Sequence, residues 1–330
     1  MTLSLYLLTR IFGPIADILY LNGLFQVIRL LYDYTIGLLP IPFIYIILPI
    51  VIFLVFRQIL GKSNWKNKLI NIAEIILYIF CAFYLTWALN YNATPVEEKI
   101  NLLVENPSDE ELIMRFEEIS LKLSSLSANI GERPQLNFQE LEKTIRPVLE
   151  SVLSDFNYPT MGRVRVRKII PGSILRIRTS GIYIPHAFEG HVDGGLYRMQ
   201  WPFTIAHEMS HGYGITHESD CNFFAFLVCT QIHDPIYQYS ANLAYWRYLA
   251  YQVRGIDKEH YQNIRDQLDP MVENDLLEIR KHINRYPDMM PKYRNIIYDK
   301  YLKSHGVSSG IKSYDRMILL LEAWNKRKSE

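Results

Sequence analysis

The sequence has little cysteine and almost no net charge. It contains three cysteines in 330 residues, and its formal charge is +1. Because there is no basic excess, we expect no nucleic-acid partner. Cys221 and Cys229 fall on one predicted helix, about 12 Å apart along its axis, which is too far for a disulfide. We interpret them as small core residues, not metal ligands.

The chain does contain long apolar runs near its amino terminus. The sequence is 49% hydrophobic, residues 34–56 carry no charge, and residues 69–89 carry only Glu74. Each run is long enough to cross about 30 Å of hydrocarbon. A buried core helix could resemble one such run, but hardly two separated by a short charged loop. We predict two membrane spans, at about 34–56 and 69–89.

The loop between these runs, residues 57–68, is basic and contains no acid. By the positive-inside bias it is cytoplasmic, which places everything after Tyr91 outside. The apolar stretch Leu3–Leu8 is too short for a span and lacks a cleavage site, so we expect no removable signal peptide. Residues 13–33 are typical of an amphipathic helix that lies against the outer leaflet or packs against protein.

The most informative motif is HExxH, formed by His207, Glu208 and His211. On a helix, residues four apart share a face, so both imidazoles can converge on one ion with Glu208 beside it. Pro202 suits the first turn of such a helix, and Gly212 suits its end. The pattern predicts two zinc ligands and one catalytic base.

A catalytic zinc needs a third protein ligand, and two adjacent residues compete for this position. His217 completes the spacing HExxHxxGxxH of the metzincins. These enzymes also have a methionine turn beneath the metal. The later candidates, Met289 and Met290, lie in a proline-bounded segment without a convincing turn pattern.

Glu218 is the alternative ligand, and we favour it. It opens a second predicted helix capped by Thr216, with Asn222 one turn later on the same face. A carboxylate ligand followed by a polar residue that orients a histidine is the gluzincin arrangement. Asp220 would point away from this face.

The fold class that we predict is α+β: amino-terminal transmembrane helices, then a mostly helical zincin-like metallopeptidase domain with a small antiparallel sheet. Helices are predicted to begin at Ser108 and at Asn137, each a polar cap followed by an acid three residues on. The expected regions are a membrane region (1–91), a helical linker region (92–156), a zincin-like core (157–235) and a carboxyl-terminal helical region (236–330).

Alternating residues at 163–170 and 174–178 predict a β-hairpin. Its outer face would carry five arginines, facing anionic lipid or substrate, or simply solvent. Residues 181–185 predict a strand that could hold a peptide by edge pairing. Residues 186–195 contain several potential ligands but are glycine-rich, so we interpret them as a loop and not as a second metal centre.

The chain resembles the bacterial domain-of-unknown-function family 3810. The similar segments are Trp87–Tyr91, Gly181–Pro185, Pro202–Gly214, Glu218–Leu227 and Tyr301–Tyr314. The resemblance implies amino-terminal membrane helices, an extracytoplasmic domain with a peptidase-like zinc site, and a place in the bacterial cytoplasmic membrane as a multi-pass protein. It also implies a glutamate at the position of Glu218, which supports the carboxylate ligand. Residues 1–12 are shorter than the first membrane helix that the family leads one to expect.

The functional hypothesis is a membrane-anchored zinc metallopeptidase. Its cofactor would be Zn²⁺, held by His207, His211 and Glu218, with Glu208 as general base. Its partners would be the lipid bilayer and a peptide or protein substrate. A tyrosine or histidine would stabilise the oxyanion, but the sequence does not select one.

Two other classes stay open. His217 could add a fourth ligand and close a structural or degenerate zinc site in a sensor or scaffold. The tyrosine-rich helices after Cys229 could bind partner proteins. The acid at Glu208 favours the enzyme, because a structural site has no need of it.

Overall fold

The computed structural model describes residues 16–291, 293, 296, 300 and 316–329. The predictions for residues 1–15 therefore fall outside the described residues. The same holds for the segment Tyr301–Tyr314 of the family resemblance.

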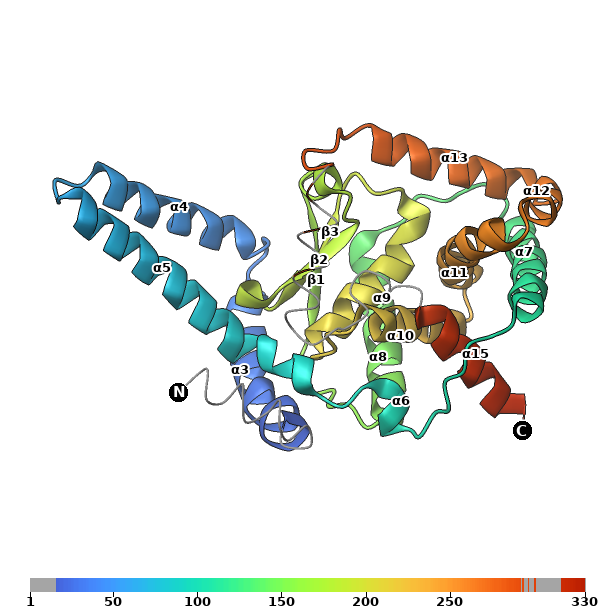
Figure 1. Cartoon of the computed structure of the whole chain (residues 1–330), viewed down its shortest axis with the longest axis horizontal. Helices are drawn as coiled ribbons and strands as arrows, with labels where there is room; N and C mark the ends of the chain where they lie inside the picture. Colours follow the sequence, from blue (N-terminus) through green and yellow to red (C-terminus); the bar gives the residue numbers. More distant parts are fainter. Residues whose placement is uncertain (1–15, 292, 294–295, 297–299, 301–315, 330) are drawn as a thin grey trace.

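The described chain is mostly helical, with one small sheet, so the α+β class is confirmed (Figure 1). Its longer helices are α3 (Phe25–Asp33), α4 (Ile44–Leu60), α5 (Trp65–Thr86), α7 (Asp109–Ile130), α8 (Phe138–Asp155), α9 (Trp201–Gly212), α10 (Glu218–Gln231), α11 (Pro235–Ile256), α12 (Lys258–Asp266), α13 (Pro270–Asn284) and α15 (Arg316–Ser329). Its short helical elements are η1 (Ala16–Leu24), η2 (Ile36–Leu38), η3 (Ala88–Asn92), α6 (Val96–Lys99), η4 (Leu175–Ile177), η5 (Pro185–Ala187) and η6 (Arg198–Gln200). The strands are β1 (Arg165–Ile169), β2 (Gly181–Ile184) and β3 (Glu189–Asp193).

The sheet has the order β1-β3-β2, and β3 is buried at every position. β1 runs parallel to β3 and β2 runs antiparallel to it, so the sheet is mixed and the predicted purely antiparallel sheet is wrong. Helix α9 lies on the sheet and is packed on its other sides by α8, α10 and α11. The HExxH segment is therefore the central helix of the body.

The predicted β-hairpin at 163–178 is also wrong in its second half. Only β1 forms, and the following residues curl around the buried carboxylate of Asp193. Its Oδ1 accepts the backbone N–H groups of Gly172 and Gly195, at 2.7 and 2.8 Å. Its Oδ2 accepts those of Ile174 and Leu175, at 2.9 and 3.1 Å. Because these donors serve a turn, they are not available to a strand ladder. Asp193 itself ends β3, in a segment that we predicted to be a loop.

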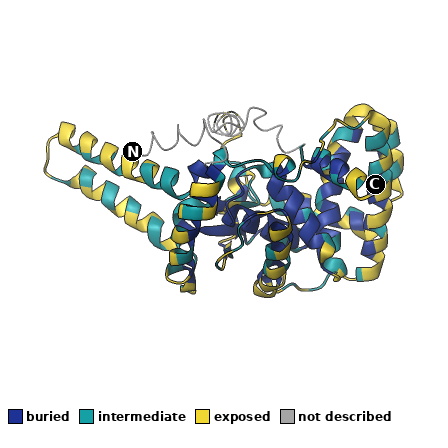
Figure 2. Cartoon of the chain, turned by 90° about the horizontal axis from the view of Figure 1, so that it is seen from below, coloured by how far each residue is buried: buried dark blue, intermediate teal, exposed yellow. Residues whose placement is uncertain are grey.

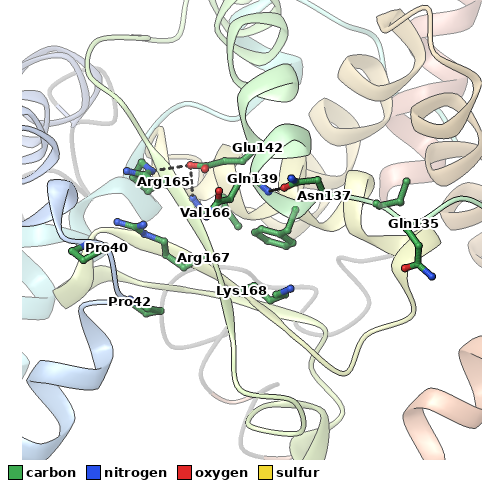
Figure 3. A pocket seen from close by; sticks show the side chains of 12 residues that line it. Pro40, Pro42, Gln135, Asn137, Gln139, Glu142, Arg165, Val166, Arg167 and Lys168 are labelled. Carbon is green, nitrogen blue, oxygen red and sulfur yellow. Dashed lines mark hydrogen bonds and ion pairs between the residues drawn. The ribbon is translucent and has the colours of Figure 1, made fainter.

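The arginines of β1 point neither to lipid nor to free solvent. Arg165 donates to Glu142 at 2.9 Å, as Figure 3 shows, and also to the carbonyl of Gly37. Arg167 donates to Glu189 at 3.0 Å and to the carbonyls of Gly37 and Leu39. The ion pair with Glu142 joins the sheet to α8, and the hydrogen bonds to the Gly37 and Leu39 carbonyls join it to the segment that enters α4.

Helices α4 and α5 form a pair that projects from the body (Figure 1). Neither contains a buried residue, and Figure 2 shows their surfaces as exposed or intermediate, whereas the body has a buried interior. Among the described residues, one helix, α5, is long and apolar enough to cross a membrane, and α4 is a shorter apolar helix. Residues 34–43 belong to neither helix: Pro40 and Pro42 lack the N–H groups that would extend α4 backwards.

Residues 16–33 pack one face against the body. For this inner face, the predicted packing against protein is therefore the correct alternative, and the predicted contact with the outer leaflet is not. Tyr20, Leu21 and Phe25 are buried in the hydrophobic core. The outer face is apolar and exposed: Ile18, Leu19, Val27 and Leu31 each expose more than half of their surface.

Both predicted caps of the linker helices are confirmed. Ser108 makes a full capping box with Glu111, and Asn137 accepts two backbone N–H groups at the start of α8. The predicted cap Thr216 is wrong, because α10 begins after His217, which makes no side-chain cap bond. Core residues from all four expected regions contribute to one hydrophobic cluster, so the four-part division stays a prediction.

Candidate metal centre

Three glycines let α9 lie close to the sheet. A Cβ at Gly190 would come within 2.8 Å of Glu208 Cβ, and one at Gly181 within 2.5 Å of Glu208 Oε1. A Cβ at Gly212 would meet Val164 at 2.1 Å. With Pro202 in the first turn of α9, these residues fix where the helix begins and how near Glu208 lies to the sheet.

His207, His211 and Glu218 form one group of potential metal ligands. Their ligand atoms all lie within 4.8 Å of one another, and it is the one such group among the described residues. Glu218 Oε2 lies 3.1 Å from His207 Nε2, and Glu218 Oε1 lies 3.7 Å from His211 Nε2. Two atoms bound about 2.1 Å from a tetrahedral zinc lie roughly 3.4 Å apart. The donor set and its spacing therefore fit zinc.

Both histidines are held through their other ring nitrogen. His207 Nδ1 lies 2.8 Å from Asn222 Oδ1, and His211 Nδ1 lies 2.7 Å from the carbonyl of Ile215. Since these oxygens can only accept, each Nδ1 carries a proton, which in the neutral imidazole leaves the lone pair on Nε2, the nitrogen that faces Glu218. Asn222 in turn donates to the hydroxyl of Tyr248 at 3.3 Å.

The competing ligands lie outside the group. His217 stands at the start of α10, directly before Glu218. The carboxylate of Asp220 is buried and accepts from Ser219 and from the backbone of Val96. Cys221 is buried and free on the Nδ1 side of His211, at 3.3 Å. Of the two methionines considered for a methionine turn, Met290 lines the cleft described below.

Glu208 is 3% exposed, and its Oε2 is a buried oxygen without a hydrogen-bond partner among the described residues. Burial raises the pKa of Glu208 to about 7, and the two histidines only partly offset this. The pKa of Glu218 is instead held well below its ordinary value: burial raises it, but His211 and His207 lower it more. The pKa values of the two carboxylates are thus shifted in opposite directions by their surroundings.

The group opens into a cleft of about 880 Å³. One wall is β2, and a second wall is the face of α11 that carries Ser240, Leu243, Ala244, Arg247 and Tyr248. The structure records no hydrogen bond or ion pair for Arg247 within the described part of the chain. Tyr183 and Tyr248 both reach the cleft, so both remain candidates for the oxyanion role.

A third wall was not anticipated from the sequence. It is formed by Phe83, Trp87 and Tyr91, at the end of α5 and just after it. The Trp87 ring lies 4.7 Å from that of Tyr183 and 5.9 Å from that of His211, between centroids. The family resemblance singled out residues 87–91, but it did not indicate that they would lie beside the candidate metal ligands.

Comparison with known proteins gives one match. A family model described as "Protein of unknown function (DUF3810)" matches residues 20–322. No curated protein and no solved structure matches the chain.

Proposed function

Since the chain belongs to the DUF3810 family, whose description assigns no activity, we propose from the site itself that it is a membrane-anchored zinc metallopeptidase. The observation that carries the proposal is the grouping of His207, His211 and Glu218 around a common point, with the buried acid Glu208 beside it. Three ligands that open into a cleft are the arrangement of a catalytic zinc, which keeps one position for water.

The proposed roles follow from the surroundings of each residue. His207, His211 and Glu218 would hold the ion. Zinc would supply an activated water and polarise the scissile carbonyl. Glu208 would accept the proton of that water and deliver it to the leaving amine, for which its pKa near neutrality is suited. Asn222 would act through His207 as a positioning residue.

The substrate would lie along β2. This strand stands at the edge of the sheet, and three of its four residues line the cleft. An extended peptide can pair with such an edge through its backbone, which selects for peptide geometry and tolerates varied side chains.

The membrane arrangement is part of the same proposal. Helices α4 and α5 would both cross the bacterial cytoplasmic membrane, with the basic tip between them inside and the zinc domain outside. Arg57, Lys62, Lys66 and Lys68 at this tip support the orientation.

A structural zinc in a sensor or scaffold is the second candidate. His217 would have to close the site as a fourth ligand, and its place outside the ligand group favours the catalytic proposal.

Zinc content tests the proposal first. We expect one zinc per purified full-length chain by elemental mass spectrometry, near-complete loss in Glu218→Ala, and full retention in the matched variant His217→Ala. Parent protein without zinc would reject the proposal, and loss in His217→Ala would favour the structural site.

Hydrolysis tests the catalytic step. Glu208→Gln should keep the zinc and lower peptide turnover by at least about 10²–10⁴-fold, the usual contribution of a general base. Turnover near that of the parent protein would reject Glu208 as the base.

A further inference from the structure

The cleft opens at the base of the projecting helix pair. Phe83 is in the last turn of α5, and Trp87 follows one turn later; both line the cleft. The helix that would anchor the protein thus forms part of the wall of its own candidate active site.

The length of α5 then determines how far the cleft lies from the bilayer. Helix α5 has 22 residues, which span about 33 Å and just cover the roughly 30 Å of bilayer hydrocarbon. The last turns of this helix already contact the body. His186 Nε2 lies 3.0 Å from the carbonyl of Ile79, and Tyr20 donates to the carbonyl of Leu85 at 2.8 Å. If α5 spans the bilayer, the part of the body that holds Phe83 lies at the membrane surface.

The surface beside this base has the composition of a lipid-facing surface. Ile18, Leu19, Val27 and Leu31 expose apolar side chains on η1 and α3, which Tyr20 links to the end of α5. Tyr84 and Tyr91, both partly exposed, lie where an aromatic belt would occur if α5 spans the bilayer.

Polar contacts connect the base of the helix pair to the wall of the cleft. Tyr32 donates to the carbonyl of His186 at 2.7 Å, and the N–H of Phe43 donates to Glu189 at 2.9 Å. Arg167 binds both Glu189 and the carbonyl of Leu39. Because β3 carries Glu189 and pairs with β2, these contacts fix the cleft wall relative to both helices of the pair.

We propose that the substrates are peptide segments of other membrane proteins, held within a few residues of the bilayer surface. This rests on the proposed function and adds to it the class of substrate. A segment that leaves a transmembrane helix would enter the cleft beside Phe83 and Trp87 and extend along β2. Soluble peptides could reach the same site, but they would lack the membrane tether. Such a tether raises the effective concentration of a segment that is held at the bilayer.

The level of the cleft can be measured without a known substrate. The full chain, with Cys81→Ser, is reconstituted in lipid vesicles and spin-labelled at one introduced cysteine; the native Cys221 and Cys229 are fully buried, and the protein without an introduced cysteine serves as the labelling blank. The cleft position is Ile182→Cys, the bilayer position is Leu77→Cys and the distal position is Gln262→Cys on α12; these side chains are all exposed. Collision with oxygen and with a water-soluble nickel chelate then gives the depth of each label.

We expect the label at Ile182 to report the headgroup layer, which extends about 5–8 Å beyond the hydrocarbon. The label at Leu77 should be inside the hydrocarbon and the label at Gln262 in water. A label at Ile182 that cannot be distinguished from the one at Gln262 would overturn the proposal, whatever the zinc content.

A second measurement compares hydrolysis. A degenerate peptide mixture is offered to the zinc-loaded vesicles in three forms: joined to a transmembrane helix by a two-residue linker, joined by a thirty-residue linker, and free. We expect the initial rate to be highest with the short linker and lowest for the free peptides, and to be lost in Glu208→Gln. Equal rates for free and short-linked peptides would overturn the substrate class. Absence of cleavage in every form would instead reject the hydrolase function.

Discussion

The helix pair and the body that carries the HExxH motif depart from the usual distribution of residues in opposite directions. Helices α4 and α5 place apolar side chains outward, with Leu77 and Phe80 more than half exposed. Helix α9 places polar side chains inward, with His207, Glu208 and His211 all buried or nearly so. Each arrangement is costly in water: the first exposes apolar surface, and the second buries ionisable groups, of which Glu208 Oε2 has no hydrogen-bond partner within the described chain.

The same physical reasoning therefore suggests a missing partner for each region. Lipid would cover the exposed apolar surface of the helix pair, and a cation would satisfy the buried imidazoles and carboxylate. If lipid and a cation are these partners, a polar substitution should harm the helix pair but not the surface of the body. A substitution that overpacks the interior should harm the body but not the helix pair.

The largest effect is expected from a charge in the middle of α5. Leu77→Asp should weaken membrane insertion by about 2.5–3.5 kcal/mol, because a carboxylate at the centre of a span must leave water. The measurement is the fraction of protein that resists alkaline extraction from membranes. The matched control is Leu121→Asp on α7, where the leucine is 74% exposed and the surroundings are water. Equal retention of both variants would contradict a membrane role for α5.

A smaller effect is expected where α9 approaches the sheet. Gly190→Ala places a methyl group within 2.8 Å of Glu208 Cβ, and the resulting overpacking should cost about 1–3 kcal/mol. It should also lower zinc occupancy, because α9 carries two of the ligands. The measurement is the unfolding midpoint of the zinc-loaded protein in detergent.

Gly255→Ala is the control for this substitution, since a methyl group there meets nothing within 4 Å. In the helix α11 it should stabilise by roughly 0.5–1 kcal/mol, as alanine is the better helix former. If both alanine variants stabilise, α9 and the sheet are not packed as closely as described.

Local features of the fold could be predicted from the sequence, and their success has a local cause. The caps Ser108 and Asn137, and the proline in the first turn of α9, act through atoms a few residues away. The spacing of His207 and His211 likewise fixes a shared face without help from the rest of the chain.

Features that depend on distant segments could not be predicted. The strand pattern at 163–178 gave no sign that Asp193 would capture the N–H groups of the following turn. Nothing in the periodicity near Trp87 indicated that it would lie beside His211, more than a hundred residues later. Edge position, parallel pairing and the walls of a cleft are set by tertiary packing, on which local propensity carries little information.

The smallest change that tests this contrast between the helix pair and the body is the loss of a single hydrogen bond. Asn222→Ala removes the acceptor of His207 Nδ1–H, which should weaken zinc affinity by about 10–100-fold, because the imidazole loses its fixed tautomer and orientation. Asn222→Asp keeps an acceptor at the same place and should retain most of the affinity. Competition with a chromophoric chelator measures both variants. An alanine variant that binds zinc as tightly as the parent protein would mean that the hydrogen bond between Asn222 and His207 does not support the metal, whereas the expected order would support an arrangement of the polar interior around α9 for a cation.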